Sequence, residues 1–222
     1  MSKRRKWLKK LLTCALSMTI LGTAAFLFLT VENGIAITAS AAETYGNFQY
    51  ETENDTVIIT KYTGSDKNLT IPSEINGKSV TSIGNSAFSW CSRLTSVTIP
   101  DSVTSIGDRA FYYCSSLTSV TIPNSVTSIG EYVFTDCPSL TSITIPDSVT
   151  SIGDGAFACT GLTTVTIGNG VTRIGEKAFD SCLGLKRFYV PIGYGDPIKG
   201  LLLESGHEID GIEFVEREAD AQ

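Results

Sequence analysis

Cysteines are the most reactive side chains in this sequence, and five of the six recur every 22 to 23 residues. If the repeats stack like strands, neighbouring cysteines lie about 5 Å apart, which permits a disulfide on Cα distance alone. Parallel side chains point the same way, however, and an odd number leaves one thiol unpaired. We therefore expect buried free thiols, with disulfides or a metal as the alternative; no C-x-x-C pair favours zinc. We interpret these five cysteines as one position of a repeat; they are Cys91, Cys114, Cys137, Cys159 and Cys182.

Catalytic chemistry has little support in the sequence. His207 is the single histidine and lies beside Glu208. An isolated histidine without a placed Ser, Cys or metal partner is usually a surface residue. Ser and Thr hydroxyls are abundant, but they fall in repeated columns, whereas catalysis needs one singular constellation. We predict that the protein is not an enzyme and holds no cofactor.

Two acidic columns raise the question of a metal. Stacked carboxylates repel one another, and bound calcium would relieve that repulsion. Local backbone hydrogen bonds at turns and helix starts already account for these residue types, so we predict no metal site. The columns are Asp101, Asn124, Asp147, Asn169 and Asp108, Glu131, Asp154, Glu176.

A repeat positions all of these residues, and 117–139 shows it most clearly. Its pattern is L-x-x-V/I-x-I-P-x-S-V-T-S-I-G-x-x-A/V-F-x-x-C, and the same letters return on both sides. Such a period is typical of a leucine-rich-repeat solenoid, in which stacked coils share one core. The recurring phenylalanines, at spacings of 23, 23, 22 and 23, are Phe88, Phe111, Phe134, Phe157 and Phe179.

Each coil has a physical interpretation. Val120 and Ile122 share one face of a short strand, and Pro123 ends the strand because it lacks a backbone donor. Gly130 fits a corner of positive φ. The acidic position after it suits one helical or 3₁₀ turn that points Phe134 inward. These features predict an α/β, β-rich solenoid, a right-handed superhelix of one short strand and one short helical turn per coil.

This unit, as it stands at 94–114 and 117–137, resembles the bacterial BspA-type leucine-rich repeat. With the caps included, the resemblance covers roughly 44–205. It implies a secreted or cell-surface protein, and some similar proteins are adhesins for host extracellular-matrix or plasma proteins. The family alone does not supply a partner.

The N-terminus predicts export. Six basic residues lie in 1–10, an apolar run covers 11–31, and small residues at 38–42 form a cleavage site after Ala41 or Ala42. The alternative is a retained membrane anchor. Removal of 1–42 leaves 11 Lys and Arg against 22 Asp and Glu, a net charge of −11. Such a protein repels nucleic acid and anionic lipid, so we predict neither as a partner.

The sequence predicts caps at both ends. Residues 43–65 break the period and alternate as a hairpin with a turn near Asn54, whereas 66–191 hold the repeats. An insertion at 74–78 is expected to project as a loop. Residues 192–222 predict a helix over 197–203 capped by Asp196, a strand over 212–215, and a loose tail.

Three surfaces are candidates for binding. A Ser/Thr lattice on the exposed strand face makes ice binding a remote alternative. Rings clustered near the turns predict a sticky ridge, although they could equally shield the turns. We predict a binding protein that mediates adhesion, with a scaffolding or wall-glycan module as the alternative. The candidate partner-binding residues are Trp90, Tyr112, Tyr113 and Tyr132 on the ridge, and Arg187 and Tyr189 at the end of the strand face.

Overall fold

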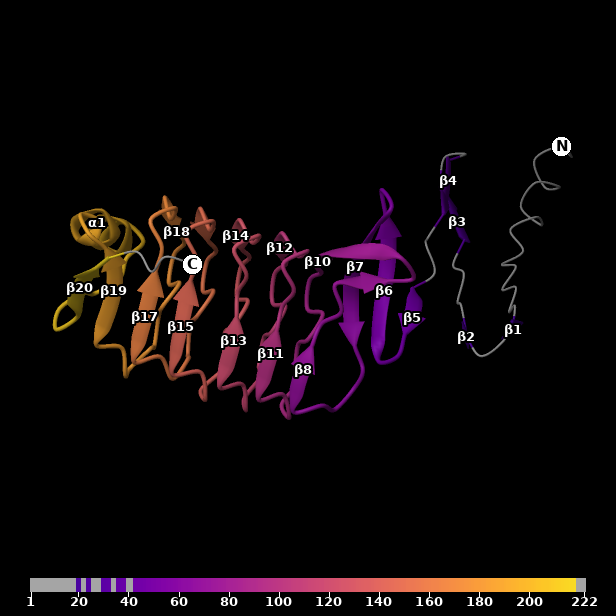
Figure 1. Ribbon diagram of the computed structural model, residues 1–222, viewed down its shortest axis with the longest axis horizontal. Coiled ribbons are helices and arrows are strands. Elements are labelled where there is room, and N and C mark those ends of the chain that lie inside the picture. The colour runs from indigo at the N-terminus through magenta and orange to yellow at the C-terminus, as the bar shows by residue number, and fades with distance from the viewer. Residues whose placement is uncertain (1–18, 21–22, 25–28, 33–34, 39–41, 219–222) are drawn as a thin grey trace, which may run out of the picture.

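The computed structural model describes residues 19–20, 23–24, 29–32, 35–38 and 42–218 (Figure 1). Most of the predicted signal segment lies outside these residues. Its described parts form two antiparallel pairs, β1 (Thr19–Ile20) with β2 (Thr23–Ala24) and β3 (Leu29–Glu32) with β4 (Ile35–Thr38). Across the described residues, no helix is long and apolar enough to cross a bilayer.

Two ladders of parallel strands run along the molecule, because every coil contributes one strand to each (Figure 1). The register is in phase: Ser96 pairs with Ser119, and Ser128 pairs with Ser151. This confirms the leucine-rich-repeat solenoid. The first ladder contains β8 (Asn68–Thr70), β11 (Ser96–Thr98), β13 (Ser119–Thr121), β15 (Ser142–Ile145), β17 (Thr164–Ile167) and β19 (Arg187–Pro191). The second contains β10 (Lys78–Ile83), β12 (Ser105–Ile106), β14 (Ser128–Ile129), β16 (Ser151–Ile152) and β18 (Arg173–Ile174).

The first ladder has a seam. In the described chain, β13 is the edge of one sheet and β15 is the edge of the next, while the second ladder continues from β14 to β16. Val120 of β13 is only partly buried, whereas Val97 and Ile143 at the equivalent positions are buried. The coils are therefore in register throughout but are held by fewer strand hydrogen bonds at this joint.

Stacked phenylalanine rings fill the core. Successive ring centroids lie 5.0, 5.4, 5.4 and 5.3 Å apart, and interplanar angles are between 4° and 14°. All five rings are buried. One coil could not cover its own ring, so each coil depends on its neighbours for burial. The stack runs through Phe88, Phe111, Phe134, Phe157 and Phe179.

The segment after each glycine is not the predicted helical turn. Ala110 N and Cys114 N donate to carbonyls three residues back, but the alternate N–H groups donate to the next coil. Arg109 and Tyr113, two of these alternating residues, have φ of 56° and 59°. Left-handed residues interrupt any helix, so the segment is a chain of turns hydrogen-bonded between coils.

The prediction of positive φ for the glycine column is wrong. Gly130 and its four equivalents lie outside the left-handed region. A Cβ on Gly130 would stand 2.7 Å from Asp108 Oδ1 and 2.9 Å from the Asp108 N. Glycine is required here because the backbone of one coil lies directly against the next.

An antiparallel hairpin covers the N-terminal end. β6 (Phe48–Glu53) and β7 (Thr56–Tyr62) are joined by Asn54 and Asp55, both of positive φ, as a two-residue turn requires. β5 (Glu43–Tyr45) adds the outer strand, and β7 pairs in parallel with β10. The hairpin thereby extends the second ladder.

The insertion at 74–78 does not project as a free loop. It forms β9 (Glu74–Ile75), which pairs with the start of β10. Ile75 is buried, and Asn76 Nδ2 donates to the Tyr50 hydroxyl at 2.8 Å. The apolar Ile75 draws the insertion back onto the core.

A helix and a strand close the C-terminal end. α1 (Gly195–Glu204) begins after Tyr194, so Asp196 lies in its first turn, paired with Lys199 at 3.2 Å, and is not the predicted cap. β20 (Glu213–Arg217) pairs with β19 and includes residues predicted to be loose. Phe214 of β20 stacks on Phe188 at 5.4 Å and covers the end of the core.

Candidate functional site

Trp90 and Tyr113 form an exposed aromatic pair. Each lies two residues after a core phenylalanine, so they occupy the same position of adjacent coils. Their ring centroids are 4.2 Å apart with the planes tilted by 32°, and the side chains are 63% and 40% exposed. Two aromatic rings in contact that remain open to solvent present an apolar surface of the kind that anchors protein interfaces.

The backbone holds these two rings in place. Trp90 and Tyr113 have φ of 65° and 59°, in the left-handed region that bulky residues avoid. Trp90 N donates to Tyr112 O at 2.8 Å, and Tyr113 N donates to Thr135 O at 2.9 Å. The ladder between coils therefore fixes the conformation. The same left-handed conformation recurs at Asp136, Cys159 and Ser181, so it belongs to the repeat, and the large rings are what distinguishes the coils of Trp90 and Tyr113.

Tyr112 completes a cluster of three rings. Its centroid lies 6.0 Å from those of Trp90 and Tyr113. Its side chain is half-buried, and burial together with the neighbouring Asp136 carboxylate raises the pKa of Tyr112. Tyr112 therefore contacts both exposed rings from a less exposed position.

Tyr132 lies apart from this cluster. The Arg109 guanidinium sits 5.0 Å from the centre of the Tyr132 ring, and the ring also packs against Gly155, where a Cβ would stand 2.6 Å from it. Tyr132 is half-buried. Arg109 and Asp136 were not predicted as part of the site. The available signal was that Arg109 occupies the repeat position of Tyr132, and Asp136 occupies that of Trp90.

Arg187 and Tyr189 meet at the end of the strand face. Arg187 pairs with Glu213 Oε2 at 2.6 Å, and its guanidinium lies 5.8 Å from the centre of the Tyr189 ring. Arg217 approaches the same ring at 5.9 Å. The charges of Arg187 and Glu213 already satisfy each other, so this end offers a partner less than the aromatic cluster does.

Four cysteines occupy the predicted column. Cys114, Cys137 and Cys182 are buried and donate to the phenylalanine carbonyl of the preceding coil at 3.2 to 3.3 Å, and Cys91 is partly buried. Burial raises the pKa of Cys91 and Cys182, which keeps these thiols protonated and unreactive. All five repeat cysteines are free.

Cys159 does not belong to the column. It is exposed with φ of 55°, and Thr160 takes the buried place, donating to Phe157 O at 2.8 Å. The signal was in the sequence: Cys159 follows its phenylalanine by two residues and the other four follow theirs by three. The coil also lacks one residue after Thr160, so the spacing from Leu140 to Leu162 is 22 residues and hides the shift of Cys159.

Side chains of the acidic columns accept hydrogen bonds from backbone N–H groups of the next coil, and not from their own turn. Asp108 Oδ1 accepts from Glu131 N at 2.8 Å, and Asp154 Oδ1 accepts from Glu176 N at 3.1 Å. Asp147 Oδ1 accepts from Asn169 N at 2.9 Å. Within the described residues, no group of three His, Cys, Asp or Glu side chains could hold a metal ion. These carboxylates join coil to coil.

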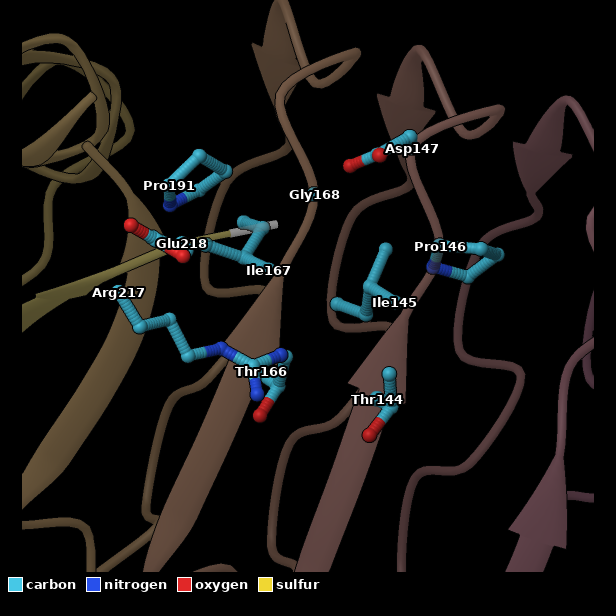
Figure 2. A pocket seen from close by; sticks show the side chains of 10 residues that line it. All are labelled: Thr144, Ile145, Pro146, Asp147, Thr166, Ile167, Gly168, Pro191, Arg217 and Glu218. Atoms are coloured by element: carbon cyan, nitrogen blue, oxygen red, sulfur yellow. The ribbon is translucent and has the colours of Figure 1, made fainter. Parts of the chain in front are cut away.

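The Ser/Thr lattice is interrupted. Thr121 of β13 and Thr144 of β15 are both exposed, but the seam separates their strands. Beyond it lies a pocket lined by Thr144, Thr166 and Arg217, and in Figure 2 the Arg217 side chain extends toward Thr166. Its volume of about 30 Å³ suits a water molecule. A flat, continuous array, as ice binding would need, is absent from the described strands.

His207 is part of the fold and not a surface residue. Its Nε2 accepts from Phe179 N at 2.9 Å, and Nδ1 lies 2.9 Å from Ser205 Oγ and 3.2 Å from Leu202 O. Since Nε2 accepts, the ring is neutral, and burial lowers the pKa of His207. The histidine ties the C-terminal segment to the last phenylalanine of the stack.

Residues 58–194 match the family described as BspA type Leucine rich repeat region, in six copies. The chain belongs to the BspA-type leucine-rich repeat family. The match covers the coils and the aromatic cluster. Among curated proteins, none matches the chain.

Solved structures of bacterial leucine-rich repeat proteins are similar to this BspA-type chain. A T. pallidum leucine-rich repeat protein is 35% identical, with TM-score 0.64, over 68% of this chain and 72% of that one. A Bacteroides ovatus leucine-rich repeat protein is 26% identical, with TM-score 0.60, over 79% of this chain and 53% of that one. The pneumococcal vaccine antigen PcpA, at 17% identity and TM-score 0.56 over 79% of this chain and 49% of that one, shares the fold.

Family membership indicates the general class of function. Leucine-rich repeat proteins are generally non-enzymatic scaffolds that bind other proteins. BspA-type members are typically surface or secreted proteins. The exposed aromatic cluster is the feature of this chain that fits such a task.

Proposed function

We propose that this BspA-type protein is exported and binds a protein partner at the cell surface or after secretion, acting in adhesion. The aromatic cluster of Trp90, Tyr112 and Tyr113 is the contact surface. The observation that carries this proposal is the exposed pair of rings, Trp90 in contact with Tyr113, on residues of positive φ. Buried at an interface, such rings supply the central anchors that dominate binding energy.

Arg109 and Tyr132 lie apart from the cluster and offer a second contact in the turns. A guanidinium held over a ring offers hydrogen-bond donors beside an apolar face, which suits a protein partner with a carboxylate near an apolar side chain. The mature net charge of −11 favours a partner with basic patches elsewhere. A host extracellular-matrix or plasma protein is the partner class that we propose.

A binding screen tests the proposal. The purified protein is immobilised and exposed to host matrix proteins, plasma proteins and purified wall glycan, with affinity measured by surface plasmon resonance. For a protein ligand, Trp90→Ala and Tyr113→Ala should each raise Kd by at least about tenfold. Tyr45→Ala is the matched control, because this ring is 47% exposed on β5, distant in sequence from the cluster.

Two outcomes would contradict the proposal. If neither alanine substitution weakens binding to any protein ligand, the aromatic cluster is excluded as the contact surface. Binding confined to wall glycan would favour the scaffolding alternative. Mass spectrometry of the secreted protein should place the new N-terminus at Ala42 or Glu43; an intact Met1 terminus would favour the retained anchor instead.

A further inference from the structure

A cavity of about 500 Å³ lies at the C-terminal end, between the last coil and the cap. Its floor is apolar, since Phe188 and Leu202 are buried core residues and Cys182 is nearly so. Leu185, Ile209 and Ile212 line it as well and remain partly exposed. A cavity of this size accepts one or two large apolar side chains.

Leu183 stands at this cavity and is 97% exposed. The residues that follow the column cysteine in the first two full coils are Ser92 and Ser115. An exposed leucine is ordinary by itself. The equivalent residues of the next two coils are Pro138 and Gly161, so Leu183 is the one large apolar residue at this repeat position, and it lies where a partly open cavity with an apolar floor adjoins it.

Negative charge surrounds the apolar surface. Asp180, Glu208 and Asp210 line the cavity and are exposed, against the single ammonium of Lys177. His207 adds no positive charge while its Nε2 accepts from Phe179 N. A ligand is therefore favoured if it carries cationic groups on either side of its apolar part.

The same charges disfavour two other occupants. A second copy would bring a like-charged rim and a net charge of −6 for the whole chain against this one. The chain's own last residues, which include Glu218 and Asp220, are acidic too. Both would meet repulsion at the rim.

We propose that this C-terminal cavity docks a peptide segment of a partner protein, with an apolar side chain inserted on the floor and lysine or arginine residues paired with the rim. The site is separate from the aromatic cluster and does not depend on it. Leu183 covers the inserted side chain from outside, and the rim carboxylates set its orientation and its preference for basic sequences.

Fluorescence anisotropy with three labelled peptides tests this docking site. The probes are GKKFKKG, GEEFEEG and GKKGKKG, so that charge and apolar anchor vary separately. We expect GKKFKKG to bind at least about tenfold more tightly than either of the others. Leu183→Ser should weaken its binding at least about fivefold, and Asp180→Asn with Glu208→Gln should do the same and reduce the dependence on salt.

The controls keep the result interpretable. Leu203→Ser removes a leucine that is 57% exposed on α1 outside the cavity, and Trp90→Ala alters the aromatic cluster; neither should change peptide binding. Equal binding of all three peptides, or binding unaffected by Leu183→Ser, would overturn the proposal. A dimer in sedimentation that Leu183→Ser dissociates would assign the cavity to a second copy, and tighter binding after deletion of 219–222 would assign it to the tail; either also overturns it.

Discussion

Two columns of side chains, two residues apart in every coil, follow opposite rules. The core column holds phenylalanine five times, whereas the outer turn column holds Trp90, Tyr113, Asp136, Cys159 and Ser181. Both columns lie on the same inter-coil hydrogen-bond ladder, but the outer turn column has positive φ and the phenylalanine column does not. Burial between two neighbours fixes the residue type in the first, and exposure leaves the second open to chemistry.

The largest effect should come from breaking the core column. Phe134→Ala would leave a cavity between two stacked rings and lower the free energy of unfolding by about 3–5 kcal/mol. Urea denaturation followed by circular dichroism measures it. Asp136→Ala in the outer turn column of the same coil is the control and should cost far less; equal losses would end the contrast between the columns.

The glycine column tests close coil contact. Gly130→Ala would place a Cβ 2.9 Å from the backbone of the preceding coil and should cost about 1–3 kcal/mol. Gly200→Ala is the matched control, because a Cβ there meets nothing within 4 Å in the middle of α1, where alanine is favoured. Denaturation midpoints should move in opposite directions, and a shared direction would contradict the account of Gly130.

Turn residues with left-handed φ should show the opposite preference: replacing them by glycine should stabilise the protein. Lys177 is exposed with φ of 56°, so Lys177→Gly relieves an unfavourable conformation and should stabilise the protein by about 1 kcal/mol. Lys186→Gly, an exposed residue without positive φ, should destabilise it. Thermal unfolding measures both. Destabilisation by Lys177→Gly would mean that the turns are not strained.

The smallest effect concerns the end of the phenylalanine stack and depends on pH. Burial holds the pKa of His207 below its ordinary value of 6.5, although the Leu202 carbonyl and Asp180 oppose the shift. The unfolded chain therefore takes up the proton first, so the stabilisation is complete above about pH 6.5 and is lost as the pH falls through the folded pKa. His207→Gln, which retains an acceptor for Phe179 N, should remove this part of the pH dependence of unfolding; an unchanged profile would contradict it.

The sequence predicts the repeated parts of this molecule well. The period places the strands of the first ladder, the phenylalanine stack and most of the cysteines, because one residue type recurs wherever two coils enclose it. It did not predict the second ladder, since one strand per coil was expected and two are present. The contact of Trp90 with Tyr112 and Tyr113 was predicted, whereas Tyr132 was expected in the same cluster and lies apart from it.

The errors fall where a contact crosses between coils or breaks the period. Gly130 and Asp108 look like local turn residues, yet their roles come from a neighbour 23 residues away. Cys159 was assigned to the wrong column because its spacing of 22 residues from Cys137 matched the shortened coil, although it follows Phe157 by only two residues. His207 had no repeat to compare with, and only the packing of the cap against Phe179 explains it.

The seam between β13 and β15 has a mechanical consequence. A solenoid pulled or bent along its length distributes load over both ladders, but at this joint only the β14–β16 side and the turn side carry it. We expect the molecule to flex there and, in force spectroscopy, to extend in two unequal blocks that separate at this joint. A tether built this way would yield under shear before its outermost coils do.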